Sequence, residues 1–507
     1  MNIGEWITKR AIIAPDKPFL KEKNKTYTNR QFNRRVNRTA HALVQLGLVK
    51  GMRIAVLMSN SSEFLEIFFA CAKTGIILVP LNFRLAVPEL LYILGDSAPA
   101  MLIYSSEFTA KTGELKAAGV DIQRFYRLGE ADGDGDPDFS KYADRFETLE
   151  PLEILGVDLP DPLFIMYTSG TTGDPKGAVL THQNILFGAI HSLLGYGVDR
   201  SYKSLVIAPL FHIGALAASV TPIVYAGGSL IISSFYNASE TLKTICREKI
   251  NYMFAVPVMY QMIADAPEWR DADLSHVHFF ISGGAPIPLP VIRKYQEEKG
   301  VGFVQGYALT ETGRLTSLDL EDSIRKAGSV GKEVFHVNLR IVDEHGRDLH
   351  SAEPGEILVQ GPNVFPGYWN KEAATRAVFK DGWFRTGDIG RRDEDGFVYI
   401  VGRKVEMIIS SGENIYPVEV ERVLQCLPGI REAAVVGMPD PKRGEIVGAF
   451  VILKKDAHVS EADILNALPG KIAYYKIPKR IFFVEEFPRN QSGKVLKRIL
   501  KKRVEEP

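Results

Sequence analysis

Residues 167–177 read Tyr167-Thr168-Ser169-Gly170-Thr171-Thr172-Gly173-Asp174-Pro175-Lys176-Gly177. This stretch directly follows an apolar run, 163–166, that predicts a buried strand. Its glycines let the backbone turn so that several N–H groups point at one spot, which creates an anion-binding hollow. The hydroxyls add donors and Lys176 adds a positive charge, so we expect the loop to bind polyphosphate. A plain surface turn is the alternative interpretation of such a Gly/Ser/Thr/Pro cluster.

The composition is that of a globular protein with more than one domain. The chain has 507 residues, of which 46% are hydrophobic and 24% are charged, and this length exceeds one ordinary core. Lys and Arg together number 61, as do Asp and Glu, so no overall field favours nucleic acid. We therefore expect small-molecule partners and no nucleic acid.

The cysteines and the N-terminus favour a cytoplasmic location. Cys71, Cys246 and Cys426 lie far apart, which indicates a reducing compartment and neither a disulfide framework nor a metal site. Residues 1–6 lack the basic and apolar regions of a signal peptide, and no apolar run approaches the length of a membrane span.

Strands alternate with helices over the first part of the chain, which predicts α/β architecture with parallel sheets covered on both faces. Thr28 and Gln31 form a capping box that starts one helix, Asn60 with Glu63 predicts the start of another, and Thr181 caps a third. Strands are expected at 53–58, 76–81, 101–104, 163–166, 204–208, 229–233, 252–255, 277–281 and 301–305.

Four polar or glycine-rich segments each come directly after an apolar strand. Because ligands bind outside the carboxyl ends of strands in open parallel sheets, we expect all four to line one rim and form a single active site. The segments are the loop at 167–177, Pro209-Leu210-Phe211-His212, Ser282-Gly283-Gly284-Ala285-Pro286 and Gly306-Tyr307-Ala308-Leu309-Thr310-Glu311-Thr312.

The pattern changes after these segments. From about residue 328 short strands and Gly/Asp turns predict a small barrel-like β unit. The last hundred or so residues alternate again, which predicts a separate, smaller α+β domain.

The loop at 167–177 is not a Walker loop, because Gly177 follows Lys176 where Ser or Thr belongs. It matches instead the phosphate loop of the adenylate-forming superfamily, which includes acyl- and aryl-CoA synthetases, luciferases and peptide-synthetase adenylation domains. Further motifs of that superfamily follow over nearly the whole chain, in the superfamily's order and spacing. Among its members the chain most resembles a bacterial fatty-acyl-CoA ligase. The resemblance implies that a carboxylate attacks the α-phosphorus of ATP, giving acyl-AMP and pyrophosphate, and that the CoA thiol then displaces AMP.

The resemblance also implies catalytic roles. Lys494, in Pro488-x4-Gly493-Lys494, matches the lysine that the family inserts between the carboxylate and the α-phosphate, where negative charge concentrates in the transition state. A solvated lysine in a basic tail is the alternative. Asp388 matches the aspartate that holds both ribose hydroxyls, and Arg403 a phosphate-contacting residue; a structural salt bridge is the alternative for each. The expected catalytic set is Lys494, Glu311, His212 and Arg403.

A carboxylate beside a triphosphate suggests Mg²⁺, and by resemblance Glu311 and Thr168 lie near the metal. The residues expected to bind ATP or AMP are Thr168, Ser169, Gly170, Thr171, Thr172, Gly173, Lys176, Gly283, Gly284, Ala285, Gln305, Gly306, Tyr307, Thr310, Asp388, Arg403 and Lys494.

His212 matches the family's pocket residue near the substrate carboxylate. Peptide-synthetase domains carry an Asp there to pair with an amino group, so His212 argues against amino-acid substrates. Gly214 and Ala308 are expected to contact the acyl group as well. Gly214, Ala215, Ala217 and Ala218 are small and apolar. They leave room for an acyl chain or serve close helix packing, and the sequence does not decide between the two.

The C-terminal motifs imply CoA binding and a moving domain. Ser410, Ser411, Gly412 and Glu413 match the loop that reaches the CoA tunnel, with a plain surface turn as the alternative. Val405 occupies the hinge position, where the family commonly has Asp or Lys. We expect residues 1–402 to bind ATP and acid, and residues 403–507 to form a mobile domain that carries Lys494.

We expect an AMP-forming acid–thiol ligase that joins a medium- to long-chain fatty acid to CoA. ATP and CoA are its expected co-substrates, and Mg²⁺ is its expected metal cofactor. An aryl or short-chain acid–CoA ligase is an alternative. An acyl-AMP ligase that feeds a carrier protein is another, but no large insertion separates the domains, which favours CoA. A homodimer, and weak contact between the basic tail at 494–503 and the inner membrane face, remain open.

Overall fold

The computed structural model describes residues 2–129, 135–151, 156–168, 175–410, 413–440, 443–472, 474–489 and 493–505. The chain divides into two compact units. The larger unit comprises Met1–Asn338 and Gln360–Gly382, and the smaller unit comprises Leu339–Val359 and Trp383–Pro507. The sequence predicts a boundary at residue 403 between a fixed and a mobile domain. The division into compact units does not test motion, so this boundary stays a prediction.

One seven-stranded sheet of the larger unit carries the phosphate loop. Strands β7, β4, β3, β5 and β6 run parallel, and β8 and β20 add antiparallel partners at one edge. The parallel strands confirm the sequence prediction for this region. In spatial order the strands are β20(Gly367–Tyr368), β8(Lys176–Thr181), β7(Pro162–Thr168), β4(Ile77–Pro80), β3(Arg53–Leu57), β5(Met101–Ser105) and β6(Phe125–Leu128).

The second seven-stranded sheet carries the other rim segments. Six of its strands are parallel, and only β2 runs antiparallel, as a hairpin partner of β1. In spatial order the strands are β13(Phe303–Gln305), β12(Phe279–Ser282), β11(Tyr252–Ala255), β9(Lys203–Val206), β10(Ser229–Ile232), β1(Pro18–Glu22) and β2(Lys25–Thr28).

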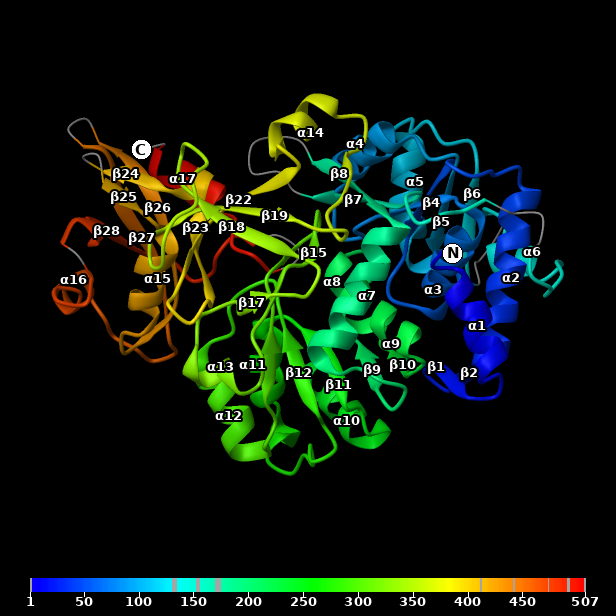
Figure 1. Ribbon diagram of the computed structural model, residues 1–507, viewed down its shortest axis with the longest axis horizontal. Coiled ribbons are helices and arrows are strands. Elements are labelled where there is room, and N and C mark those ends of the chain that lie inside the picture. The colour runs from blue at the N-terminus through cyan, green and yellow to red at the C-terminus, as the bar shows by residue number, and fades with distance from the viewer. Residues whose placement is uncertain are drawn as a thin grey trace. The chain divides into compact units, whose positions relative to one another are not determined.

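Helices cover both faces of this second sheet (Figure 1). Tyr260 of α11 and Tyr295 of α12 pack with Phe280 of β12 in one buried cluster. On the opposite face Tyr196 of α7 contacts Phe279. Alternate residues of a strand thus face different helices, as the two-residue period requires. The helices of the larger unit are α1(Glu5–Ile13), α2(Asn29–Gln45), α3(Ser62–Thr74), α4(Val87–Ser97), α5(Thr109–Ala117), α6(Phe139–Ala143), α7(His182–Tyr196), α8(Ile213–Ala215), α9(Thr221–Ala226), α10(Ala238–Glu248), α11(Pro257–Ala264), α12(Leu289–Lys299), α13(Asp322–Arg325) and α14(Glu372–Val378), with the π-helical turn η2(Leu216–Val220) between α8 and α9.

Local capping signals start several helices. Thr28 and Gln31 form the predicted capping box of α2, and Thr181 caps α7 as predicted. Helix α3 differs, because Ser61 and not Asn60 accepts the hydrogen bond from the N–H of Phe64. The predicted start of α3 at Asn60 is therefore wrong, since that side chain is used elsewhere.

The smaller unit contains two antiparallel-based sheets. The first forms the barrel-like β region from β18(Asn338–Val342), β19(Gly355–Gln360), β22(Trp383–Arg392) and β23(Val398–Arg403). The second has the order β25(Glu413–Ile415), β24(Ile408–Ser410), β27(Gly444–Leu453) and β26(Ile430–Asp440), with β28(Arg480–Phe483) parallel to β27.

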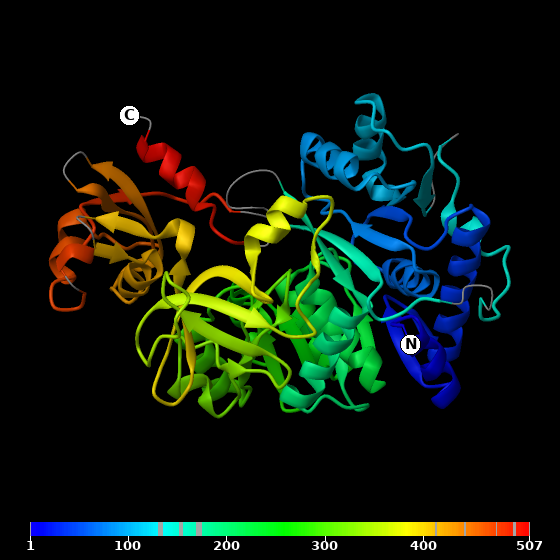
Figure 2. The ribbon, with the colours of Figure 1, turned by 45° about the horizontal axis from the view of Figure 1, so that its top comes forward.

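Helices cover both faces of this second sheet. Helices α15(Pro417–Gln425) and α16(Glu461–Ala467) pack on one face. Leu500 of α17(Lys497–Glu505) is buried against the other (Figure 2). This α+β arrangement confirms the predicted C-terminal fold. Within the described part of the chain, no helix has both the length and the apolar character that a membrane crossing requires.

Candidate active site

The foot of the phosphate loop is a β-hairpin. Thr168 ends β7 and lies opposite Lys176, which begins β8, and its hydroxyl lies 3.5 Å from the Lys176 carbonyl oxygen. The predicted strand before the loop is thus confirmed. Ser169, Gly170, Thr171, Thr172 and Gly173, which the sequence assigns to phosphate binding, lie outside the described residues.

Tyr368 links the loop lysine to the predicted metal carboxylate. The Nζ of Lys176 lies 5.4 Å from the centre of the Tyr368 ring, and the Tyr368 hydroxyl donates to Oε1 of Glu311 at 3.0 Å. The pairing of β20 with β8 positions Tyr368 there. Sequence reasoning missed this residue, because it assigned the region after 328 to the barrel-like β unit.

The segments after β12 and β13 lie side by side at the rim, as predicted. A Cβ on Gly283 would lie 4.0 Å from the Gly306 carbonyl oxygen, and a Cβ on Gly306 would lie 2.8 Å from that of Thr316. Gly284 has a φ of +81°, which only glycine adopts readily. Ala285 follows and is exposed. Close backbone approach thus favours glycine at 306, and backbone conformation favours it at 284.

The side chain of Gln305 ties the two segments together. Its Oε1 accepts from the Ile287 N–H at 3.4 Å, while its buried Nε2 has no acceptor among the described residues. That amide nitrogen is thus a buried donor that the described residues leave unsatisfied.

A second hairpin presents Thr310 and Glu311. Strands β14(Ala308–Leu309) and β15(Gly313–Arg314) pair, so Thr310 and Glu311 lie at the tip of their turn. Tyr307 is buried just before it, and its N–H bonds to the Thr316 hydroxyl at 3.2 Å. Hydrogen bonds thus hold the motif that the sequence singled out, and its two tip residues are half-buried.

His212 lies in a largely apolar environment. It precedes α8, and its ring centre lies 4.5 Å from that of Phe211. Burial, and secondarily the charge of Arg84, lowers the pKa of His212 to about 4. Its Nε2 is buried and has no partner among the described residues. The imidazole is therefore neutral at pH 7, and the described residues leave one of its ring nitrogens unsatisfied.

Asn60 is a positioning residue that sequence reasoning misassigned as a helix cap. Its Nδ2 donates to the Ala208 carbonyl at 2.9 Å, and its Oδ1 accepts from the Leu210 N–H at 2.8 Å. The side chain comes from the end of β3 in one sheet and holds the segment after β9 in the other. It therefore fixes the backbone that leads to His212. No local sequence pattern predicts a contact between residues so far apart in the chain.

Two glycines make room for one aromatic ring. A Cβ on Gly214 would lie 3.2 Å from the Phe254 ring, and a Cβ on Gly283 would lie 3.1 Å from it. Gly214 thus contacts an aromatic side chain that the sequence did not single out. Ala308, also expected near the acyl group, is exposed.

In the smaller unit, Asp388 and Arg403 form an ion pair. They lie opposite each other on β22 and β23, with 2.8 Å between Arg403 Nε and Asp388 Oδ1. Asp388 is only 4% exposed. The structure thus brings together two residues that the sequence selected separately. Their contact is a salt bridge, which the sequence analysis named as the alternative to nucleotide binding for each of them.

Lys494 lies in the electrostatic environment of the same pair. Its pKa is lowered, chiefly by desolvation and next by Arg403, while Glu406 and Asp388 oppose the change. The side chain retains solvent contact, so the desolvation is partial. Gly493, with a φ of +81°, and a hydrogen bond from Arg489 Nη1 to the Gly493 carbonyl at 2.9 Å fix the backbone before it.

The predicted hinge follows directly on β23. Lys404, Val405 and Glu406 form the 3₁₀ turn η4(Lys404–Glu406), and the side chain of Val405 lies outside the described part. In the predicted CoA loop, Ser410 ends β24 and pairs with Glu413 of β25. Ser411 and Gly412 lie outside the described residues, as does the side chain of Glu413.

No group of three or more His, Cys, Asp or Glu side chains that could hold a metal ion occurs in the described ranges. Mg²⁺ in nucleotide sites needs only one or two carboxylates, because phosphate and water supply the other ligands. Glu311, oriented by Tyr368, meets that requirement.

Two family models match the chain. The model described as AMP-binding enzyme matches residues 7–369, and that described as AMP-binding enzyme C-terminal domain matches residues 419–494. A feruloyl-CoA synthase from an Amycolatopsis species is 39% identical over 99% of both chains. A long-chain-fatty-acid–CoA ligase from Mycobacterium tuberculosis H37Rv is 38% identical over 99% of this chain and 98% of the relative.

Solved structures agree in fold. ATP-bound MatB from Rhodopseudomonas palustris superposes with a TM-score of 0.91 at 30% identity, covering 100% of this chain and 99% of the other. O-succinylbenzoate CoA synthetase from Bacillus subtilis, in complex with its acyl-adenylate intermediate, gives 0.86 at 33% identity over 98% of both chains.

Proposed function

The chain belongs to the AMP-binding enzyme family, and from this premise we propose that its substrate is an apolar carboxylic acid. It is an acyl- or aryl-CoA ligase of the AMP-forming type, with ATP and CoA as co-substrates. The relatives are named for ferulic, indoleacetic, long-chain fatty and succinylbenzoic acids, so the acid itself is the open part of the function.

The environment of His212 carries the proposal. Its ring packs against Phe211, burial holds its pKa at about 4, and its buried Nε2 lacks a partner among the described residues. A neutral imidazole offers one hydrogen bond to a carboxylate oxygen but no charge to an amino group. Gly214, Ala215, Ala217 and Ala218 follow and are small and apolar, which is consistent with an apolar acyl body. We therefore favour a medium- to long-chain fatty acid.

An aryl acid is the second candidate, and the packing of Phe254 supports it. Gly214 and Gly283 both approach the ring of Phe254 closely. A planar ring system of the substrate would stack on such an aromatic surface with an offset or edge-on geometry, as aromatic pairs prefer. Relatives named for ferulic and indoleacetic acids are consistent with this candidate.

The proposed chemistry uses fixed charges. The acid's carboxylate oxygen attacks the α-phosphorus of ATP, the bond to the β-phosphate oxygen breaks, and pyrophosphate leaves. Lys494 neutralises charge that develops at the α-phosphate, and Asp388 binds the ribose hydroxyls. In the second step the CoA thiol gives its proton to solvent and its sulfur attacks the acyl carbonyl carbon; the bond from this carbon to the phosphate oxygen breaks, and AMP leaves.

We assign Mg²⁺ to Glu311 and Thr168, where the ion would neutralise phosphate charge. Glu311→Gln should weaken the use of Mg²⁺·ATP, so that half-maximal turnover needs more Mg²⁺, while leaving the fold intact, because a neutral amide is a poorer ligand for a hard cation. Glu321→Gln, an exposed acid at the start of α13, is the matched control. An unchanged magnesium titration in Glu311→Gln removes this residue from the metal site.

A substrate screen tests the proposal. Acids from acetate to long-chain fatty acids, together with aryl acids and amino acids, are supplied with ATP and CoA, and released AMP is measured. Fatty acids should give the highest kcat/KM, and a maximum for aryl acids would select the second candidate. A maximum for amino acids would contradict an apolar acid. Consumption of CoA in the same assay separates a CoA ligase from an acyl-AMP ligase that feeds a carrier protein.

A further inference from the structure

A basic hollow lies on the larger unit, beside the first turns of α2. It has a volume of about 590 Å³, and four of its lining residues are cationic while none is acidic. None of them belongs to the nucleotide, acid or CoA set described above. The residues that line the hollow are Lys25, Thr26, Tyr27, Gln31, Arg34, Arg35, Arg38 and Thr148.

Only two of the four cations are neutralised by neighbours. Arg35 Nε lies 2.5 Å from Glu66, and Arg38 Nη1 lies 3.0 Å from Asp144. Lys25 and Arg34 are exposed, and within the described ranges neither forms an ion pair. The hollow therefore keeps an excess of positive charge, and the positive end of the α2 dipole adds to it.

Donor capacity also remains unused. The Nε of Arg38 is buried and has no acceptor among the described residues. The lining further contains the hydroxyls of Thr26, Tyr27 and Thr148 and the amide of Gln31. Arginine forks match the oxygens of a phosphate group in geometry as well as in charge.

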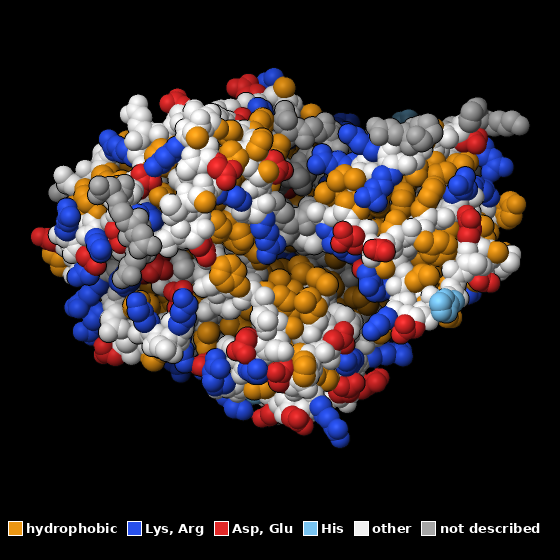
Figure 3. Space-filling model, turned by 180° about the vertical axis from the view of Figure 1, so that it is seen from behind, with side chains coloured by type: hydrophobic (Ala, Val, Ile, Leu, Met, Phe, Trp, Pro, Cys, Tyr) orange, Lys and Arg blue, Asp and Glu red, His pale blue; other side chains and the backbone are white. Residues whose placement is uncertain are grey.

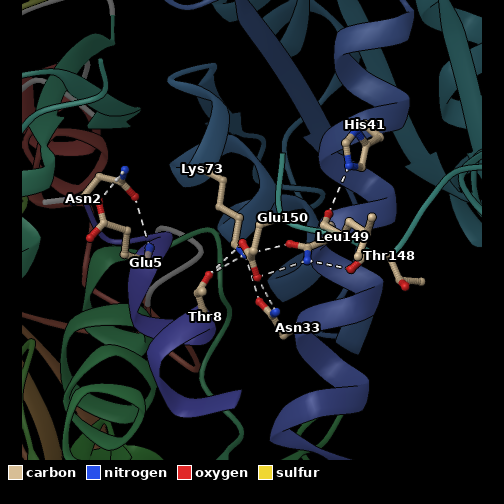
Figure 4. Close-up of polar contacts among 10 residues, drawn as sticks. Asn2, Glu5, Thr8, Asn33, His41, Lys73, Thr148, Leu149 and Glu150 are labelled. Carbon is tan, nitrogen blue, oxygen red and sulfur yellow. Dashed lines mark hydrogen bonds and ion pairs between the residues drawn. The ribbon is translucent and has the colours of Figure 1, made fainter. Parts of the chain in front are cut away.

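The wall that contains Thr148 is held in place by a partly buried polar network (Figure 4). Asn37 Nδ2 donates to the Thr148 carbonyl at 2.9 Å, and His41 Nε2 lies 3.1 Å from that of Leu149. Glu150 is anchored by Lys73, whose Nζ lies 2.6 Å from Oε2. Side chains of α2 and α3 thus hold residues 148–150 beside α2. The hollow is therefore preformed, which lowers the entropy lost when a ligand binds.

We propose that this hollow binds the phosphate group of a small molecule, such as a phosphate ester or a polyphosphate. Cations of α2 and β2 line the same hollow, so several of them can contact one compact anion. A lipid headgroup has the same chemistry, and the vesicle arm of the test below distinguishes it from a free phosphate compound.

Arginine footprinting tests the proposal on the full chain. Phenylglyoxal modification of each arginine is measured by mass spectrometry with and without inorganic pyrophosphate, at ionic strength matched with sodium chloride. We expect pyrophosphate to protect Arg34 and Arg38. Arg30 lies on the same helix, is largely exposed and does not line the hollow, so it serves as the internal control. This local readout separates the hollow from the active site, which also binds pyrophosphate.

Variants sharpen the test. In Arg34→Gln the pyrophosphate concentration that protects Arg38 should rise about tenfold, since one charge-assisted contact is lost. The matched variant Arg30→Gln should leave it unchanged. CoA ligation should survive in both variants, so failure here leaves the enzymatic proposal standing.

Three outcomes would overturn the proposal. The first is no protection of Arg34 and Arg38 by pyrophosphate or phosphate, and the second is equal protection of Arg30. The third is protection only by phosphatidic acid in phosphatidylcholine vesicles, which would assign the hollow to a lipid headgroup.

Discussion

At the level of single residues, the smaller unit brings together three charged side chains that the proposed adenylation step would use. Asp388 and Arg403 are paired across β22 and β23, and the charges of both act on Lys494. An ion pair that is partly buried holds its members at fixed positions, so the field at Lys494 is preorganised. The catalytic role of Lys494 stays a prediction, and its alternative is a lysine with no part in the reaction.

Lys494→Ala should lower the rate of acyl-AMP formation by roughly two to three orders of magnitude, as expected for loss of one preorganised donor. Thioester formation from supplied acyl-AMP should largely survive, because the α-phosphate has by then lost its leaving group. Single-turnover assays of each half-reaction measure both effects. Lys502→Ala, an exposed lysine of the same tail, is the matched control. Equal losses in both half-reactions would refute the assignment.

Buried histidines make the larger unit sensitive to acid. Burial is the main cause that lowers the pKa of His182 and of His191 to about 4, against 6.5 in the unfolded chain. Between these pH values the unfolded state binds more protons than the folded state, so stability rises with pH. The stabilisation present above pH 6.5 is lost as the pH falls towards 4, by roughly 3 kcal/mol for each histidine.

His191→Phe tests this pH dependence. Neither ring nitrogen of His191 has a partner among the described residues, and its ring stacks on His336 at 5.3 Å, so an apolar ring should fit. We expect near-wild-type thermal stability above neutral pH and a smaller loss at pH 5. His458→Gln, at an exposed histidine, should keep the wild-type pH dependence. Identical curves for wild type and His191→Phe would contradict the prediction.

At the scale of elements, the turn η4 is the predicted hinge. It directly follows the pair of strands that holds Arg403, and Glu406 within it bonds to Lys497 of α17 at 3.3 Å. A hinge must absorb large changes in backbone angles over few residues. Residues 404–406 connect two ordered sheets of the smaller unit and have the required length.

Val405→Pro should stall the complete cycle while one half-reaction persists, because proline fixes φ and removes the N–H. Val405→Lys restores the commoner family residue and should raise the overall rate if domain rotation limits turnover. Val405→Ala, which leaves the backbone free, is the control. Wild-type rates of both half-reactions and of the cycle in Val405→Pro would show that the hinge lies elsewhere.

At the scale of the whole molecule, charge does not favour a strong membrane contact. Basic and acidic side chains are interspersed on the face in Figure 3, in keeping with 61 of each sign. In the basic tail, Lys497 is paired with Glu406 and Glu421, and Lys501 with Glu445. These internal pairs leave fewer cations for anionic lipid than the sequence suggests.

Weak contact between the tail and anionic membranes stays a prediction. Sedimentation with anionic vesicles should show binding at low salt that disappears at high salt, since each basic residue contributes only about 1 kcal/mol. Arg498→Gln with Lys502→Gln removes exposed charges and should abolish it. No sedimentation at low salt rules the contact out.

A homodimer also stays a prediction, which light scattering tests.

Much of the fold was predictable because its signals are local. Apolar runs predicted the strands of both large sheets, and the Ser/Thr caps predicted the starts of α2 and α7. Asn60 shows the limit of such signals. Its spacing to Glu63 predicts a cap, yet its amide joins the ends of two sheets and leaves the cap to Ser61. The preference of Asn60 for capping the helix was overridden because its side chain makes tertiary hydrogen bonds instead.

The phosphate-loop composition, the order of the motifs and the family could be read from the amino-acid sequence, since they depend on residues that are near each other in the chain. Folding was needed to show that Tyr368 holds Glu311, that Arg403 pairs with Asp388, and that cations of β2 and α2 line a hollow. These contacts form because strand pairing and helix packing bring distant residues together. Packing selects those partners through shape and burial across the whole core, which no local pattern encodes.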